Sequence, residues 1–152
     1  MINQNTLSPS KEPKSTDPFH VLLISIIFDP AARKILVMRK DGDPELGAKF
    51  TWGFPGTEMY HGDDMDKRLK TKIKEKTGLE IKNLGAVFSK VYPEKKDYMA
   101  IYFLCEVFGG KMKPWKFYKE LKWVDPEDIE KLFTTSFHPR LKEYIINLKK
   151  KF

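Results

Sequence analysis

The order of hydrophobic and polar positions predicts strands on both sides of one central helix. Residues 19–29 form a strongly apolar run and residues 34–39 form a second, with Pro30 opening the turn between them. Short apolar runs bounded by turn residues are typical of strands in a buried sheet. We therefore predict that these two runs pair as a hairpin. Residues 40–51 contain two glycines and one proline and are predicted to form a loop.

A helix is predicted after this loop and a short extended piece at residues 52–54. Its apolar residues recur every four positions and therefore share one helix face; they are Met65, Leu69 and Ile73. Asp63 or Asp64 would cap the N-terminus, where acidic side chains also suit the helix dipole. Gly78 would end the helix as its C-terminal cap.

The second half of the chain predicts three strands and two helices. The strands are residues 80–92, 97–108 and 120–124, and the helices are residues 129–132 and 138–149. Asp125 would cap the first of these helices, with Pro126 as its first residue. This order predicts an α/β (α+β) sandwich with a mixed β-sheet between helices. Residues 18–152 are expected to form one domain after a flexible polar tail, residues 1–17.

Composition agrees with a single globular domain. The 152 residues are enough for a sizeable core, and 41% hydrophobic with 32% charged residues is typical of soluble proteins. The longest apolar run, residues 21–28, is too short to span a bilayer, so no membrane partner is expected. No secretory pattern is visible, and a cytoplasmic location is expected. Cys105, the only cysteine, is expected to be an inert core thiol.

The net charge of +7 favours anionic partners through long-range attraction. Nucleotides, RNA and acidic surfaces all meet this condition, and charge alone does not select among them. Much of the excess lies at residues 67–76 and 149–151. The second of these groups is interpreted as a solvated surface.

Residues 52–79 carry the most informative motif. They read WGFPGTEMYHGDDMDKRLKTKIKEKTGL: a turn, an acidic helix start, a basic amphipathic helix and a closing glycine. This layout resembles the Nudix box, G-x5-E-x7-R-E-U-x-E-E-x-G-U, in which U is a bulky apolar residue. The KILVMRK strand and the ELKWVD segment at residues 120–125 also resemble that family. The resemblance implies a Nudix-type α/β/α sandwich that hydrolyses a nucleoside diphosphate linked to another moiety, with Mg²⁺ or Mn²⁺.

The chain departs from the box at the charged positions. Of the closing glutamate pair only Glu75 is kept, and the first glutamate is shortened to Asp63. Gly56 stands one place before the position of the opening glycine. The replaced positions, in the order glycine, arginine, glutamate and glutamate, are Thr57, Thr71, Lys72 and Lys76.

These departures weaken the metal chemistry that the resemblance implies. Mg²⁺ needs hard oxygen ligands, which a lysine cannot supply. At an effective dielectric constant of about 20, two like charges about 4 Å apart repel by about 4 kcal/mol. Lys72 and Lys76 therefore argue against a cluster of two or three metal ions. If hydrolysis is retained, we expect Glu75, Asp63 and Glu120 as ligands or base, with Glu75 and Asp63 holding one Mg²⁺ or Mn²⁺.

Two interpretations of the replacing lysines remain open. Lys72 and Lys76 are four residues apart and share a helix face. Their ammonium groups would bind a diphosphate directly, where the family holds its metal ions, and no cofactor would then be needed. Alternatively, the basic residues at 67–76 are a solvated face. Thr71 favours that alternative, because the arginine of the family at this position orients a catalytic glutamate.

Further ligand-binding candidates flank the helix: Arg39, Trp52, Phe54 and Gly56. The two aromatic residues among them would either stack on a base or belong to the core. Trp115, Phe117 and Tyr118 form an aromatic run between lysines. Such runs occur where proteins contact single-stranded nucleic acid or stack on a base. Loop packing or a dimer contact is the alternative.

The leading hypothesis is a Nudix-family protein whose ligand is a nucleotide or another diphosphate-containing small molecule. Its hydrolysis is expected to be weak or altered. One alternative is an inactive Nudix-fold module that binds such a ligand, and another is a basic RNA-associated accessory protein. A homodimer is compatible with each. Specificity is expected to lie in the loops at residues 40–51 and 111–119, and the sequence alone does not identify the substrate.

Overall fold

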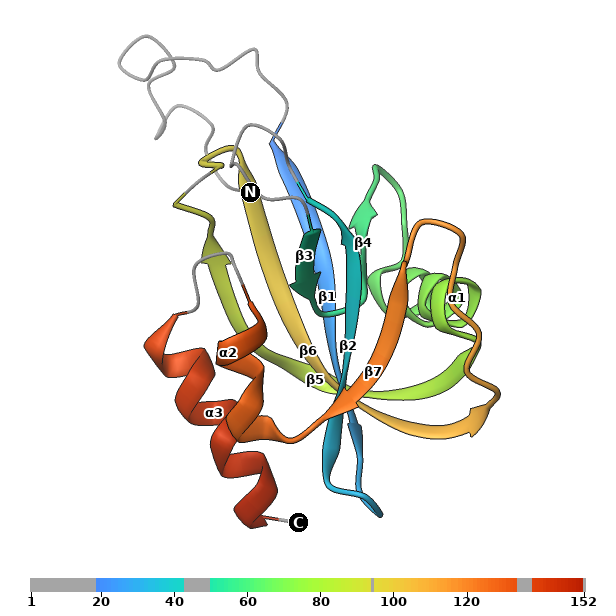
Figure 1. The fold of residues 1–152 in the computed structure, drawn as a ribbon. Helices are drawn as coiled ribbons and strands as arrows, with labels where there is room; N and C mark the ends of the chain where they lie inside the picture. The colour runs from blue at the N-terminus through green and yellow to red at the C-terminus, as the bar shows by residue number, and fades with distance from the viewer. Residues whose placement is uncertain (1–18, 43–49, 94, 134–137, 152) are drawn as a thin grey trace, which may run out of the picture.

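The computed structural model describes residues 19–42, 50–93, 95–133 and 138–151. Within these residues seven strands form one mixed sheet, with helix α1 on one face and α2 and α3 on the other (Figure 1). The strands are β1 (His20–Asp29), β2 (Lys34–Asp41), β3 (Phe50–Gly53), β4 (Gly56–Met59), β5 (Leu79–Val91), β6 (Tyr98–Gly110) and β7 (Glu120–Val124). The helices are α1 (Met65–Thr77), the 3-10 helix η4 (Pro126–Asp128), α2 (Ile129–Leu132) and α3 (Pro139–Lys151). This arrangement confirms the predicted fold class; the predicted tail at residues 1–17 lies outside the described residues.

The sheet is built around β1, and its main strand order is β3-β2-β1-β6-β5. Strand β1 runs parallel to β6, while β4 and β2 share its other edge. The predicted hairpin of β1 and β2 is confirmed only at its closed end, where Phe28 pairs with Ile35 and Asp29 with Lys34. Beyond this end, β4 takes the edge of β1. The sequence did not predict β4, because its four residues alternate too briefly to be detected.

Alternate side chains of β1 contribute to two separate cores. Ile26 and Phe28 pack in the cluster that contains the buried residues of α2 and α3. Leu23 and Ile27 pack in the cluster that contains those of α1. Because successive side chains of a strand point to opposite faces, this division places helices on both sides of the sheet. Cys105 is fully buried in the second cluster, and burial raises the pKa of its thiol to about 12.

Both ends of α1 are fixed by specific hydrogen bonds. The Asp64 carboxylate accepts the N–H of Lys67 at 2.9 Å, so Asp64 is the cap of the two acids considered. At the other end Gly78 has φ 78° and donates to the carbonyl of Lys74. The predicted C-terminal cap is therefore confirmed.

The segment at residues 111–119, which joins β6 to β7, is attached to the C-terminal end of α1. The N–H groups of Lys111, Lys113 and Trp115 donate to the carbonyl oxygens of Gly78, Thr77 and Lys76, at 3.1, 2.8 and 2.9 Å. Carbonyl groups at a helix end lack partners within the helix. The 111–119 segment satisfies three carbonyls at this end and thereby holds a fixed position beside α1.

The predicted C-terminal helices are also present. Pro126 begins the turn η4, and α2 continues from it. Leu141, Ile145 and Leu148 of α3 recur every three or four residues and are buried against the sheet. In the part of the chain that the structure describes, no helix combines the length and the apolar character needed to cross a membrane.

Replacing Gly78 with alanine is expected to destabilise the fold more than replacing Gly62. Both glycines have positive φ, 78° and 80°, so alanine at either costs about 1–2 kcal/mol of backbone strain. A Cβ on Gly78 would also collide with the Lys111 carbonyl oxygen, whereas a Cβ on Gly62 meets no described atom within 4 Å. We expect the free energy of unfolding in urea to differ by about 1–3 kcal/mol between the variants. Equal losses of stability in the two variants would show that the 111–119 segment moves away from the added Cβ without measurable cost.

Candidate functional site

The turn between β3 and β4 is fastened to the central strand. The backbone N–H and the hydroxyl of Ser25 both donate to the carbonyl oxygen of Pro55, at 2.9 and 2.8 Å. Gly56 follows and lies against β1, because a Cβ on it would be 2.6 Å from the carbonyl oxygen of Leu23. Only glycine permits this approach of two backbones.

Lys76, in the last turn of α1, makes the contact that defines the site. Its ammonium group donates to the carbonyl oxygen of Gly56 at 2.7 Å and lies 4.7 Å from the centre of the Trp115 ring. The N–H of Gly56 donates to the phenol oxygen of Tyr118 at 3.4 Å. Gly56, Lys76, Trp115 and Tyr118 therefore form one connected group, called here the glycine–lysine cluster.

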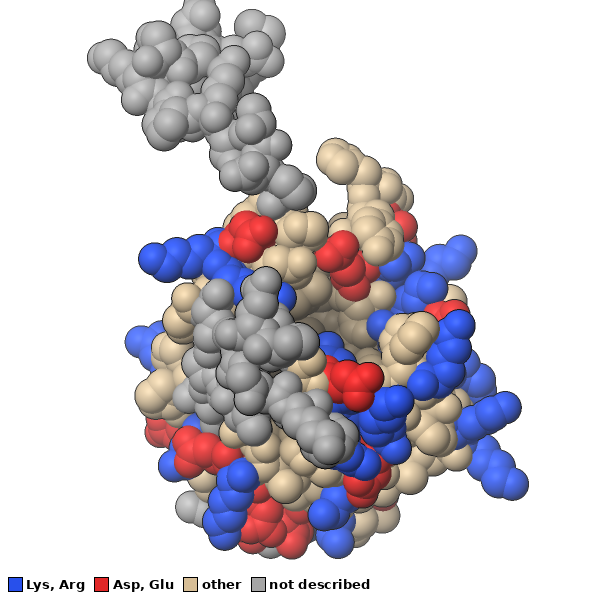
Figure 2. Space-filling model, turned by 45° about the horizontal axis from the view of Figure 1, so that its top comes forward, with Lys and Arg blue, Asp and Glu red and all other residues tan. Residues whose placement is uncertain are grey.

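The electrostatic environment of Lys76 is positive. Burial, together with the charges of Lys40 and Lys72, lowers the pKa of Lys76 to about 8; Glu75 opposes this shift and Arg68 adds to it. Positive charge therefore exceeds the negative charge nearby, a condition that attracts anions. Figure 2 shows lysine and arginine side chains gathered on the side of the molecule that carries α1, beside a hollow in the surface.

Glu75, the box glutamate that the chain keeps, is bound to the neighbouring lysine. The Lys72 ammonium lies 3.0 Å from its Oε2. The hydrogen bond and the charge of Lys72 lower the pKa of Glu75, with smaller contributions from Lys76 and Arg68. The carboxylate is exposed, and Lys72 is its ion-pair partner.

Asp63 stabilises the loop that precedes α1. Its Oδ2 accepts the N–H of Tyr60 at 2.8 Å and lies 3.2 Å from Nε of Arg68. Arg68 also donates to the carbonyl oxygen of Glu58 at 2.9 Å, and its guanidinium group lies 4.7 Å from the centre of the Tyr60 ring. Arg68, which the sequence placed only on a basic helix face, thus has a fixed position.

The donor set at this site does not fit Mg²⁺ or Mn²⁺. The two carboxylates predicted to hold the ion are each paired with a cation, Glu75 with Lys72 and Asp63 with Arg68. Among the described residues, no group of three or more His, Cys, Asp or Glu side chains is arranged to hold a metal ion. Such ions require several free oxygen ligands.

Three further candidates lie side by side on the other face of the sheet. Arg39 of β2 is opposite Trp52 of β3 and Glu120 of β7, and its Nε lies 3.4 Å from Oε1 of Glu120. Trp52 packs against the core beneath α2 and α3. Residues that pair directly across neighbouring strands share a face, so Arg39 and Glu120 lie on this face too. The sheet therefore separates Glu120 from Glu75, although both were predicted to act together.

Phe54 belongs to the core. Its side chain is 5% exposed, and its ring packs against the rings of Tyr102 and Phe133 at centroid distances of 6.3 and 4.9 Å. Of the two roles considered for this residue, the structure shows the packing role. We therefore leave Phe54 out of the proposed ligand site.

Two aromatic residues of the 111–119 segment belong to the site, although the sequence did not predict them there. Trp115 and Tyr118 were considered for nucleic-acid contacts or loop packing. Trp115 is half-buried with Lys76 over its ring, and Tyr118 is buried beside Gly56. No local signal pointed to the contact of Trp115 with Lys76, which lies thirty-nine positions earlier in the chain. The pairing of Tyr118 with Gly56 had no local signal.

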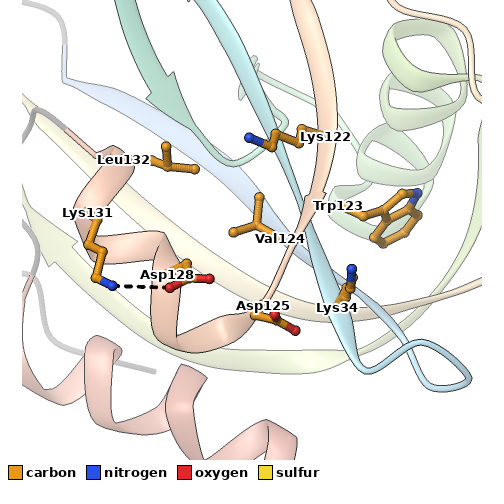
Figure 3. Close-up of a pocket in the computed structure, with 8 residues that line it drawn as sticks. All are labelled: Lys34, Lys122, Trp123, Val124, Asp125, Asp128, Lys131 and Leu132. Atoms are coloured by element: carbon orange, nitrogen blue, oxygen red, sulfur yellow. Dashed lines mark hydrogen bonds and ion pairs between the residues drawn. The ribbon is translucent and has the colours of Figure 1, made fainter.

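A separate pocket of about 320 Å³ lies between β7 and the segment formed by η4 and α2 (Figure 3). Lys34, Lys122 and Lys131 line it together with Asp125 and Asp128. Lys131 lies 3.4 Å from Asp128, so charges of both signs partly balance there. Its lining includes none of the ligand-binding or catalytic candidates named from the sequence.

A mixed sheet between helices, with a glycine turn held against a basic box helix, defines a Nudix-type protein. The NUDIX domain model matches residues 18–145, and the chain therefore belongs to this family. An ADP-ribose pyrophosphatase of Methanocaldococcus jannaschii is 28% identical over 102 residues, which are 65% of this chain and 59% of that protein. The match thus spans less than two thirds of the relative's length.

Solved structures show the same fold. The MutT protein of Methanosarcina mazei matches with a TM-score of 0.66 and 15% identity, over 91% of this chain and 98% of that one. An ADP-ribose pyrophosphatase from Streptococcus suis matches with a TM-score of 0.62 and 17% identity, over 88% and 91% of the two chains.

Replacing Lys76 with methionine is expected to change how stability depends on pH. Below pH 8 the lysine is charged in the folded and the unfolded chain. Between about pH 8 and about pH 10.4, the reference pKa of lysine, the unfolded chain binds more protons. The free energy of unfolding of the native protein should therefore rise with pH across this window, relative to Lys76→Met. Urea unfolding at several pH values measures this, and parallel profiles would contradict the lowered pKa.

Proposed function

We propose that this Nudix-family protein binds a diphosphate-containing nucleotide at the lysine-rich end of α1, without a metal ion, and hydrolyses it weakly or not at all. The observation that carries the proposal is the hydrogen bond from the Lys76 ammonium to the carbonyl oxygen of Gly56. It fixes the Lys76 ammonium near Lys72, and these two lysines stand in place of two glutamates of the box pattern.

The geometry leaves Lys76 able to bind an anion. An ammonium group has three N–H donors, and the Gly56 carbonyl accepts one of them. Phosphate oxygens would accept others. Lys40 and Lys72 raise the positive potential at this point, so a bound diphosphate would relieve their mutual repulsion.

The same geometry supports the proposal that hydrolysis is weak. Metal-assisted hydrolysis depends on a cation that activates water and neutralises the phosphate charge. Lysines would supply part of the neutralisation, but an ammonium group does not generate a bound hydroxide. Glu75, the nearby carboxylate, is held by Lys72 and its pKa is lowered, which makes it a weak base.

The choice of ligand for a first test comes from the relative. The Methanocaldococcus jannaschii protein is named an ADP-ribose pyrophosphatase, and ADP-ribose contains a diphosphate between two sugars. We propose ADP-ribose or a compound of the same class as the ligand. A cytoplasmic location, expected from the sequence, agrees with such a ligand.

Binding of ADP-ribose in the presence of EDTA is expected for the native protein. Lys76→Gln should weaken it by about 10- to 100-fold, because a hydrogen bond to a charged group contributes about 1.5–3 kcal/mol. The matched control is Lys67→Gln, an exposed lysine in the first turn of α1, which should change affinity little. Calorimetric titration measures all three proteins. Equal affinities of the two variants, or binding that requires Mg²⁺, would contradict the proposal.

Turnover is tested separately with Mg²⁺ and Mn²⁺, using ADP-ribose and nucleoside triphosphates. We expect little or no product from the native protein. The double variant Lys72→Glu/Lys76→Glu restores the carboxylates of the box, and product from it alone would show that the two lysines suppress hydrolysis. Rapid turnover by the native protein would contradict the proposal and indicate a working hydrolase.

A further inference from the structure

Phe117 is an exposed aromatic residue next to the glycine–lysine cluster. Its side chain is 55% exposed, whereas Trp115 is half-buried and Tyr118 is buried. Its ring meets the ring of Trp115 edge to face, with centroids 4.6 Å apart. The Lys76 ammonium lies 4.7 Å from the same Trp115 ring. Phe117 and Lys76 thus flank one indole.

The position of Phe117 is supported from beneath. Trp115 is held by the backbone hydrogen bond to Lys76 and by an edge contact with the ring of Tyr118, at 5.5 Å between centroids. The ammonium of Lys116 lies 4.9 Å from the centre of the Phe117 ring. Single exposed apolar residues are common on protein surfaces and carry no function by themselves. What distinguishes Phe117 is its place beside an indole ring that also contacts the Lys76 ammonium.

We propose that Phe117 is the stacking surface for the nucleobase of the ligand, so that the site selects nucleoside diphosphates over diphosphates that lack a base. This inference rests on the proposed function and adds the residue that recognises the base. A nucleotide carries a planar base and a phosphate chain on one small scaffold. The exposed ring and the cation beside the same indole match these two parts.

The arrangement favours a single nucleotide over a nucleic-acid strand. Proteins that bind single strands present several aromatic residues on which successive bases stack. In the aromatic run at residues 115–118, Tyr118 is buried and Trp115 is half-buried with the Lys76 ammonium over its ring, whereas Phe117 is exposed. One stacking surface serves one base.

The test compares ADP with inorganic pyrophosphate, both titrated without metal. Native protein should bind ADP more tightly than pyrophosphate. Phe117→Ala should weaken ADP binding by about 5- to 100-fold, the range of base–aromatic stacking, and should leave pyrophosphate binding unchanged. Phe117→Tyr keeps the ring and should retain the native preference. Phe108→Ala, at another exposed phenylalanine on β6, is the matched control and should behave as native protein.

The outcomes separate the two proposals. Pyrophosphate binding that Lys76→Gln weakens, with ADP bound no more tightly, would overturn the stacking role of Phe117 and leave the diphosphate site standing. Equal losses for ADP and pyrophosphate in Phe117→Ala would assign Phe117 a structural role and overturn the inference. Native protein that binds neither compound would overturn both proposals. Tighter binding of a single-stranded oligonucleotide than of ADP would identify a nucleic-acid contact instead.

Discussion

The hydrogen bond between the Lys76 ammonium and the Gly56 carbonyl oxygen is the contact on which the site depends. It joins the last turn of α1 to the first residue of β4. It exists because Gly56 has no side chain and lies against the backbone of Leu23 on the central strand. Tyr118 occupies the N–H of the same glycine, so one small residue connects a helix, the sheet and a long loop.

The positive charges gathered at this site repel one another. Lys76 is partly buried, and Lys40 and Lys72 add positive charge around it, which is costly in a folded protein. The Gly56 carbonyl and the Trp115 ring offset part of this cost. A protein of this family usually places carboxylates here. The chain keeps the frame of the box helix and reverses the sign of the charge that it presents.

Local sequence patterns predicted much of the fold. The spacing of Leu69 and Ile73 located the buried face of α1, and Gly78 its end, since both depend on neighbours within a few residues. Strand β4 was missed because β1, more than thirty residues earlier, supplies its hydrogen bonds. The pairing of β1 with β2 proved partial for the same reason. Both β2 and β4 pair with one edge of β1, and neither the sequence of β1 nor that of β2 predicts this.

The site was predicted in fragments. Helical spacing correctly brought Lys72 and Lys76 to one region, but the contacts of Lys76 with Gly56 and Trp115 cross twenty and thirty-nine positions of the chain. Glu120 was grouped with Glu75 on chemical type alone. Which face of the sheet a strand residue occupies depends on strand order and register, and these are set by tertiary packing.

Trp115, in the loop between β6 and β7, contacts Lys76 through both its backbone and its side chain. The Trp115 N–H bonds the Lys76 carbonyl, and the Trp115 ring lies beneath the Lys76 ammonium. We therefore expect the backbone and side-chain contacts to open together, and with the bonds of Lys111 and Lys113 to form one cooperative unit in hydrogen exchange. Order imposed on this loop from outside would spread into the last turn of α1, so the helix end and the loop act as a single mechanical element.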